Sequence, residues 1–138
     1  MNPKPACDTQ ARPTILLAED EPDQSDMLRD ALQDEGYDVQ IASSGDVAYS
    51  KLSEQNYDLV IMDIRMPGLN GGTVLKALRL KRNKAEAPVI IVSAFASEAD
   101  MRRYRADGAS AAISKPFEMS ELLQLVAELI PARAKASP

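Results

Sequence analysis

Asp63 is the side chain in this sequence that is best placed to do chemistry. An unbroken apolar run at residues 59–62 leads directly into it, and a stretch rich in proline, glycine and asparagine follows at residues 67–71. A short apolar run bounded by turn residues is typical of a strand buried on both faces. We therefore expect Asp63 at the carboxyl end of such a strand, where open α/β sheets place their ligand sites. A simple turn cap would not explain this apolar approach.

Two further acids, Glu19 and Asp20, follow the apolar run at residues 15–18. In a parallel sheet with these two strands as neighbours, Glu19 and Asp20 would converge with Asp63. Three crowded carboxylates repel one another, so at pH 7 they need raised pKa values or a cation. Hard oxygen ligands without histidine or cysteine suit Mg²⁺. Taken alone, the acids after the first strand are explained equally well as helix-entry residues.

Ser93 and Lys115 follow the apolar runs at residues 89–92 and 111–113. The same topology brings both side chains to the edge that carries Asp63. A cation site, a hydroxyl, an ammonium group and a carboxylate that can attack are equipment for phosphoryl transfer. Each side chain alone has a simpler explanation, a strand-end hydroxyl for Ser93 and a solvated surface cation for Lys115. Their joint occurrence at strand ends favours a site for phosphoryl transfer.

The elements that must position these side chains alternate along the chain. The predicted strands are residues 15–18, 37–42, 59–62, 89–92 and 111–113, and the predicted helices are residues 23–35, 43–56, 72–82, 97–106 and 119–130. Met27, Val47 and Leu78 are among the helical side chains expected to face the core. Five such repeats predict a flavodoxin-like (βα)5 fold, a doubly wound five-stranded parallel sheet in the order 2-1-3-4-5.

Length and composition indicate one globular domain. The chain has 138 residues, of which 45% are hydrophobic and 27% charged, which is ordinary for a globular protein with a full core. We expect a disordered extension at residues 1–13, the domain at residues 14–130 and a flexible tail at residues 131–138. No apolar run suits a signal peptide or a membrane span, so we expect a cytoplasmic protein without membrane contact.

The sequence also excludes several classes of function. It has no histidine, which excludes the usual His/Cys zinc sites, Ser-His-Asp catalysis and donation of a phosphoryl group from the chain's own histidine. Cys7 is the single cysteine, so no internal disulfide can form. A net charge of −5 disfavours direct nucleic acid binding. The basic residues from Arg79 to Lys84 are better explained as complements to a helix C-terminus.

With these residues in place, the chain resembles the receiver domains of two-component response regulators, over residues 14–130. The matching motifs, each at a predicted strand end, are Glu19-Asp20, Asp63 within Met62-Asp63-Ile64-Arg65-Met66-Pro67-Gly68, Ser93-Ala94 and Lys115-Pro116-Phe117. The resemblance implies that Asp63 is the phosphoacceptor. It also implies that Mg²⁺ is bound by Asp20, Asp63 and the backbone carbonyl of Arg65.

For the remaining motif residues the resemblance implies supporting roles. Glu19 would act largely through metal-bound water. Ser93 would bond a phosphoryl oxygen, and Lys115 would pair with the phosphoryl group or with Asp63. A cis Lys115–Pro116 bond is also implied.

By the same resemblance, the donor would be a sensor histidine kinase or a histidine phosphotransfer protein, docking beside the first helix. Only eight residues follow Ile130, so we expect a stand-alone switch, a monomer or weak dimer, whose output passes through an unknown downstream protein target. It would support its own phosphotransfer and autodephosphorylation without being a turnover enzyme. A phosphorelay or phosphate-sink role remains an alternative.

One position departs from the pattern. Many receivers carry Tyr or Phe three residues before the lysine, and here that residue is Ala112. Phe95 and Tyr104 lie nearby in the sequence as possible substitutes. Arg65 and Phe95 also occupy positions that, by the resemblance, tune dephosphorylation.

Three other classes of protein stay open. They are a phosphatase with an aspartate nucleophile, a flavodoxin-like mononucleotide binder, and a receiver-like interaction module that is never phosphorylated. The chain has no insertion long enough for a phosphatase cap. The acidic loop after the first strand would repel a nucleotide phosphate unless a metal intervenes. The intact acid set argues against the third class, whereas Ala112 is compatible with it.

Overall fold

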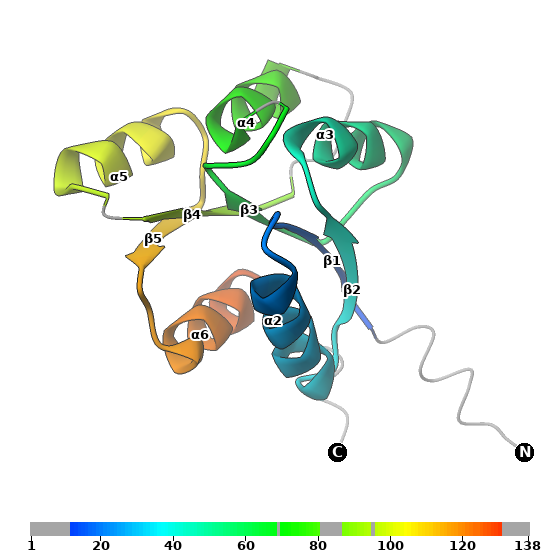
Figure 1. Ribbon diagram of the computed structural model, residues 1–138. Helices are drawn as coiled ribbons and strands as arrows, with labels where there is room; N and C mark the ends of the chain where they lie inside the picture. The colour runs from blue at the N-terminus through cyan, green and yellow to red at the C-terminus, as the bar shows by residue number, and fades with distance from the viewer. Residues whose placement is uncertain (1–11, 69, 81–86, 95, 131–138) are drawn as a thin grey trace, which may run out of the picture.

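A computed structural model describes residues 12–130 apart from residues 69, 81–86 and 95. Five strands alternate with five helices (Figure 1). The strands are β1 (Thr14–Ala18), β2 (Asp38–Ala42), β3 (Leu59–Asp63), β4 (Val89–Ala94) and β5 (Ala111–Lys115). The helices are α2 (Pro22–Asp34), α3 (Gly45–Glu54), α4 (Gly71–Leu80), α5 (Glu98–Ala106) and α6 (Met119–Leu129). The expected extension at residues 1–13 lies outside the described residues up to residue 11, and the expected tail at residues 131–138 lies wholly outside them.

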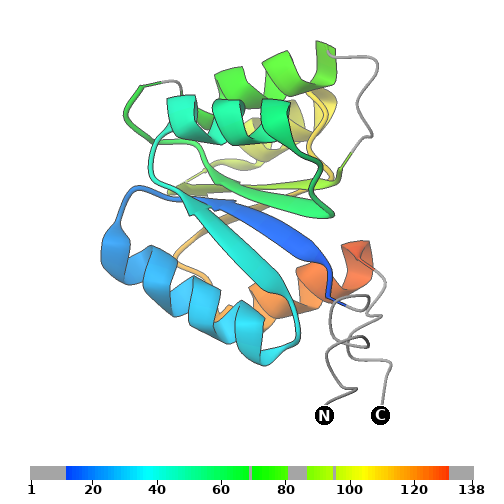
Figure 2. The same ribbon diagram turned by 90° about the vertical axis from the view of Figure 1, so that its right-hand side faces the viewer.

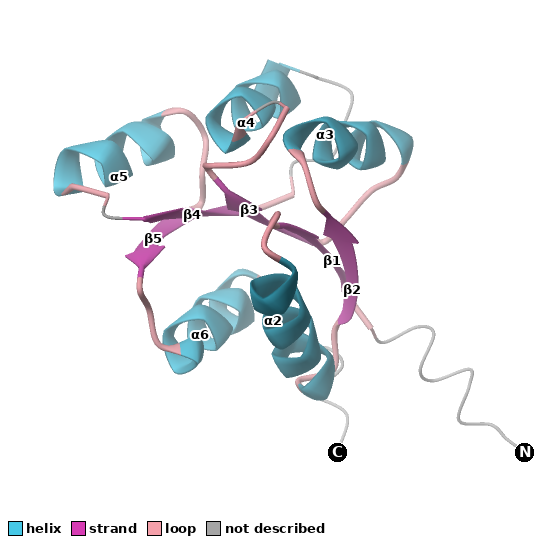
Figure 3. Cartoon of the chain, viewed as in Figure 1, coloured by secondary structure: helices cyan, strands magenta, loops and turns pink. Residues whose placement is uncertain are grey.

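The strands form one parallel sheet in the order β2-β1-β3-β4-β5, which confirms the predicted flavodoxin-like topology. Helices α2 and α6 cover one face of the sheet, and α3, α4 and α5 cover the other (Figures 2 and 3). The register places Ala18 of β1 beside Met62 of β3, and Asp63 beside Val92 of β4. All five carboxyl ends therefore meet at one edge.

The core consists of two apolar layers, one on each face of the sheet. Along β3, Val60 and Met62 pack on the side of α3 and α4, whereas Leu59 and Ile61 pack on the side of α2 and α6. All four are at most 1% exposed, so each contributes on the order of 1.5–3 kcal/mol through burial. This two-sided burial explains the continuous apolar run that precedes Asp63.

Two side chains expected in the core are on the surface. Met27 is 54% exposed and Val47 is 40% exposed. Helix α2 buries Ser25, Leu28 and Leu32, and Met27 is rotated about 100° from Leu28 around the helix axis, which takes it to the border of the covered face. The prediction for these two was wrong because an apolar stripe does not say how wide a face the sheet covers. The side chain of Leu78 lies outside the described residues.

Element ends lie within two residues of the predicted ones where the predicted boundary is described. The most consequential differences are in β4 and β5, which run to Ala94 and Lys115 because Ser93 pairs with Ser114 and Ala94 with Lys115. Ser93 and Lys115 are thus members of paired strands rather than loop residues, which fixes their backbones. Within the described residues, no helix is long and apolar enough to cross a membrane.

Candidate functional site

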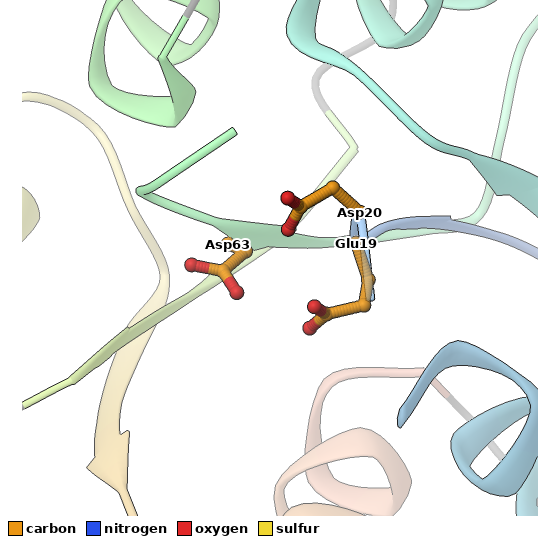
Figure 4. A group of neighbouring side chains, drawn as sticks. All are labelled: Glu19, Asp20 and Asp63. Carbon is orange, nitrogen blue, oxygen red and sulfur yellow. The ribbon is translucent and has the colours of Figure 1, made fainter. Parts of the chain in front are cut away.

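Three carboxylates converge at the edge formed by the ends of β1 and β3. One oxygen from each of Glu19, Asp20 and Asp63 lies within 4.8 Å of the other two, and the three side chains point into the same space (Figure 4). Glu19 is 4% and Asp63 6% exposed, whereas Asp20 is open to solvent. The convergence expected from the strand order is therefore present.

The carboxylate of Asp63 is held by one donor on each oxygen. The ammonium group of Lys115 donates to Oδ2 at 2.7 Å, and the backbone N–H of Arg65 donates to Oδ1 at 3.0 Å. Lys115 comes from β5, which is two strands away from β3 in the sheet. A charge-assisted hydrogen bond on one oxygen and a backbone donor on the other fix the orientation of the carboxylate.

Lys115 also donates to Oε1 of Glu19 at 3.4 Å, and the backbone N–H of Glu21 donates to Oε2 of Glu19 at 3.1 Å. Burial raises the pKa of Glu19, and the negative charge of Asp63 adds to this rise, which the Glu21 hydrogen bond and Lys115 only partly offset. Burial alone would lower the pKa of Lys115, but its hydrogen bonds and charge pairing with Asp63 and Glu19 raise it overall.

The ammonium group of Lys115 thus pairs with two of the three clustered carboxylates, Glu19 and Asp63, which leaves an excess of negative charge that a divalent cation would balance. The donor set consists of carboxylate oxygens, which is the chemistry that Mg²⁺ prefers. The three residues present thus fit the ion that the sequence predicts.

The loop after Asp63 is fixed by close backbone packing. Gly71, the first residue of α4, donates its N–H to the carbonyl of Ile64 at 3.0 Å. A Cβ on Gly71 would collide with the carbonyl oxygen of Asp63 and come within 3.1 Å of Ile64 Cα. Gly45 at the start of α3 donates to the carbonyl of Pro67 at 3.1 Å, which anchors the middle of the loop.

We expect Gly71→Ala to destabilise the fold by about 1–3 kcal/mol, the usual cost of forcing a group into filled space. Backbone atoms of Asp63 and Ile64 meet the new Cβ and cannot rotate away. The matched control is Gly72→Ala, whose Cβ would meet only Asn70 Oδ1 at 3.3 Å and Ile64 Cδ1 at 3.9 Å. Urea unfolding should show Gly72→Ala to be clearly more stable than Gly71→Ala, since its new Cβ meets side-chain atoms only and alanine favours helices. Equal stability of the two variants would contradict the packing.

A hollow of about 440 Å³ lies beside Lys115, on the side of α2. It is lined by Gln24, Met27, Leu28, Ala94, Lys115, Pro116, Phe117 and Met119. The side-chain oxygen of Gln24 is buried without a hydrogen-bond partner among the described residues. The sequence did not reveal this hollow, because its walls come from three distant segments. No signal in the sequence marks it, because Met27, which lines it, is expected to face the core.

The response regulator receiver domain matches residues 15–127 of the chain. The chain belongs to this family. Receiver domains are signalling modules of two-component systems rather than turnover enzymes, and phosphorylation and Mg²⁺ are typical of the family.

Two relatives differ in the share of their length that the receiver match covers. The chain is 38% identical over 109 residues to the uncharacterized transcriptional regulatory protein YkoG of Bacillus subtilis, covering 79% of the chain and 47% of YkoG. It is 32% identical over 113 residues to the polar-differentiation response regulator DivK of Brucella ovis, covering 82% of the chain and 92% of DivK. The receiver thus spans about half the length of relatives such as YkoG and nearly all of DivK.

Among solved structures, the receiver is similar to that of the sensor histidine kinase PA1611 from Pseudomonas aeruginosa PAO1. The TM-score is 0.77 at 29% identity, covering 86% of this chain and 98% of the other. That structure was determined with a magnesium ion coordinated in its active site cleft.

The other predicted residues of the receiver lie as follows. Ser93 is buried in β4, one residue beyond Val92, the register partner of Asp63. The Lys115–Pro116 bond is cis, as the resemblance predicts. Ala112 is buried on the side of α3 and α4, where Tyr104 of α5 packs against the same cluster. Phe95 lies outside the described residues.

Proposed function

We propose that this receiver is a phosphorylation-dependent signalling switch in which Asp63 accepts a phosphoryl group from a phosphohistidine of a partner protein. The observation that carries the proposal is the carboxylate of Asp63, buried at the sheet edge and held between the Lys115 ammonium group and the Arg65 N–H. The domain would comprise residues 14–130. The donor would be a sensor histidine kinase or a histidine phosphotransfer protein, and the output would be a changed affinity for a downstream protein.

In the proposed reaction an oxygen of Asp63 attacks phosphorus, and the bond between phosphorus and the histidine nitrogen breaks. The electron pair of that bond stays on the imidazole, which takes up a proton. Lys115 balances the negative charge carried by the new acyl phosphate, and the hydroxyl of Ser93 donates a hydrogen bond to a phosphoryl oxygen. Hydrolysis of the acyl phosphate by water returns the receiver to its resting state.

We infer that Mg²⁺ is held by Asp20, Asp63 and the backbone carbonyl of Arg65, with Glu19 acting largely through bound water. The excess of carboxylates over ammonium groups and the ion in the related PA1611 receiver support this inference. When bound, the ion would neutralise charge on the phosphoryl oxygens. Asp20 is the exposed member of the set, which leaves the site accessible from solvent.

The proposal is tested by the intact mass of the protein after incubation with acetyl phosphate, with and without Mg²⁺. A gain of one phosphoryl group that requires Mg²⁺ is the expected result. If a folded protein gains no phosphoryl group from acetyl phosphate or from a phosphorylated histidine kinase, the interaction module that is never phosphorylated becomes the better explanation.

We infer that the partner docks over the hollow between α2 and the loop that follows β5. This hollow reaches Lys115, and its rim carries the exposed Met27. On α2, Asp23 and Asp26 are exposed beside these lining residues in the helix, and Asp26 pairs with Arg29 at 3.3 Å. An apolar surface with an acidic border fits a partner helix whose apolar face is flanked by basic residues.

We expect Met27→Glu to slow phosphotransfer from a phosphohistidine protein by about tenfold or more, because it places a charge in the apolar contact that Met27 would make with the partner. Labelling by acetyl phosphate should be unchanged, since that donor needs no docking surface. Val47→Glu is the matched control, because Val47 is a similarly exposed apolar residue on α3, on the opposite face of the sheet. Equal transfer rates for the two variants would show that the partner does not use this hollow.

A further inference from the structure

Helix α5 is held by two partly buried apolar side chains, Met101 and Tyr104, and by contacts at its two ends. None of its nine residues is fully buried, so it gains less from the apolar burial that stabilises most protein helices. Its N-terminus is closed by a capping box, in which the hydroxyl of Ser97 accepts from the N–H of Asp100 and the carboxylate of Asp100 accepts from the N–H of Ser97, each at 3.1 Å. The contacts at its C-terminal end therefore add to a small number of contacts that hold α5 in place.

That C-terminal end is held by Arg79, which comes from the last turn of α4. The guanidinium group donates to the carbonyl of Gly108 through Nε at 3.1 Å and through Nη2 at 2.7 Å. Gly108 has a φ of +117°, and a Cβ there would lie 2.8 Å from Arg79 Cγ and 2.9 Å from Nε. The arginine side chain therefore packs directly against the glycine, and two charge-assisted bonds reach the carbonyl-rich end of α5.

The opposite end of α4 contacts the acceptor. Gly71, its first residue, bonds the carbonyl of Ile64 and packs against the carbonyl of Asp63. The ten residues of α4 span about 15 Å, so this one helix contacts Asp63 at its start and, through Arg79, contacts Gly108 just beyond the C-terminus of α5. A short helix moves as a rigid body, and a displacement of the acceptor loop would shift Arg79.

The seam between α4 and α5 is otherwise loosely filled. A hollow of about 390 Å³ lies there, lined in part by Thr73 and Lys76 of α4 and by Tyr104 of α5. The one ion pair across this seam among the described residues joins Lys76 to Asp107 at 4.0 Å, and the Lys76 side chain is 66% exposed. Such a pair contributes little. The Arg79–Gly108 contact is therefore the stronger of the two polar links.

We propose that Arg79 is a positioning residue that ties α5 to α4, so that a change at Asp63 reaches α5 through α4. This inference rests on the proposed phosphorylation of Asp63. It assigns to Arg79 a role in conveying the phosphoryl state to α5, and none in the transfer of the phosphoryl group itself.

The test is hydrogen exchange of α5 backbone amides, measured by mass spectrometry with and without acetyl phosphate and Mg²⁺. The variants are wild type, Arg79→Met, Arg79→Lys and Lys76→Met. In wild type we expect phosphorylation to change exchange in α5. Arg79→Met should take up the phosphoryl group like wild type. Its α5 amides should exchange about tenfold faster than those of wild type, as expected for loss of a hydrogen bond to a charged group. Phosphorylation should then no longer change their exchange rate. Arg79→Lys, which keeps one charged donor, should retain part of the response, and Lys76→Met all of it.

The outcomes separate this inference from the proposed function. If wild type takes up no phosphoryl group, the proposed function fails and the coupling fails with it. If the adduct forms but α5 responds in Arg79→Met as in wild type, only the coupling is overturned. Faster exchange across every segment of Arg79→Met would also overturn it, because that pattern belongs to a purely structural residue. Loss of the response in Lys76→Met would show that charge in the seam matters, rather than the bond to Gly108.

Discussion

Replacing Asp63 with asparagine is expected to abolish the phosphoryl adduct completely while leaving the protein folded. The amide of asparagine is not a nucleophile under conditions in which a carboxylate accepts a phosphoryl group. Its oxygen can still accept the N–H of Arg65, and Lys115 keeps its contact with Glu19. Removing one of three crowded negative charges also relieves repulsion. We therefore expect the free energy of unfolding to stay within about 1 kcal/mol of wild type or to rise.

The measurement is intact mass after exposure to acetyl phosphate and Mg²⁺, followed by peptide mapping. The matched control is Asp58→Asn, since Asp58 immediately precedes the opposite end of β3 and its carboxylate accepts only the exposed Thr14 N–H among the described hydrogen bonds. Asp58→Asn should be labelled like wild type. A phosphoryl adduct that persists in Asp63→Asn, on any other residue, would contradict the assignment of the acceptor.

The sheet was predictable because its information is local. The apolar runs in β1, β3 and β4 are continuous since those strands are covered on both faces, and the alternation with helices then limits the topology to few arrangements. Once the strand order is known, residues at strand ends must meet. The convergence of Glu19, Asp20 and Asp63 therefore follows from the sequence alone.

The hollow beside α2 was not predictable for the opposite reason. Its walls combine Gln24, Ala94 and Phe117, whose mutual distances depend on how far α2 and the loop after β5 extend over the sheet edge. The sequence shows helical periodicity, but it does not show how far a helix or loop extends over the sheet edge. Met27 was consequently assigned to the core, although it borders this hollow.

Arg79 shows how far a sequence pattern can place a cation. The basic residues that begin with Arg79 are predicted to complement a helix C-terminus, and Arg79 lies in the last turn of α4. In the structure it binds Gly108, just beyond the C-terminus of α5. The sequence marks Gly108 as a helix stop, but nothing in a linear pattern pairs that stop with a residue 29 positions earlier. The neighbouring Lys81, Arg82 and Lys84 lie outside the described residues.

Replacing Lys115 with alanine is expected to lower the free energy of unfolding of the metal-free protein at pH 7 by about 2–3 kcal/mol. Removing one partner of a buried ion pair typically costs about 3–5 kcal/mol, because the other charge stays buried without compensation. The side chain of Lys115 is 24% exposed, so we expect less than that range. Lys76→Ala, which removes a 66% exposed lysine, should change stability by less than about 0.5 kcal/mol.

The stability deficit of Lys115→Ala, meaning the difference in free energy of unfolding between wild type and the variant, should depend on pH both above and below pH 7. Pairing with Asp63 and Glu19 raises the pKa of Lys115 in the folded protein. The stabilisation that this pairing provides is fully present below about pH 10.5, the ordinary pKa of lysine. It is lost as the pH rises through the raised pKa. Burial raises the pKa of Glu19 above 4.5. As the pH falls from 7 toward 4.5, Glu19 binds a proton more readily in the folded than in the unfolded chain, which favours folding and reduces the charge that Lys115 must balance. The deficit is therefore largest near neutral pH.

Urea unfolding of both proteins from pH 4.5 to 11 without metal, repeated at pH 7 with Mg²⁺, measures this dependence. Mg²⁺ should stabilise Lys115→Ala more than wild type, because the ion then supplies the positive charge that the lysine no longer provides. A deficit that stays constant across the pH range and does not respond to Mg²⁺ would mean that Lys115 stabilises the edge through the packing of its aliphatic chain. In that case its ammonium group would not balance the charges of Glu19 and Asp63, and its proposed part in accommodating the phosphoryl group would lose its physical basis.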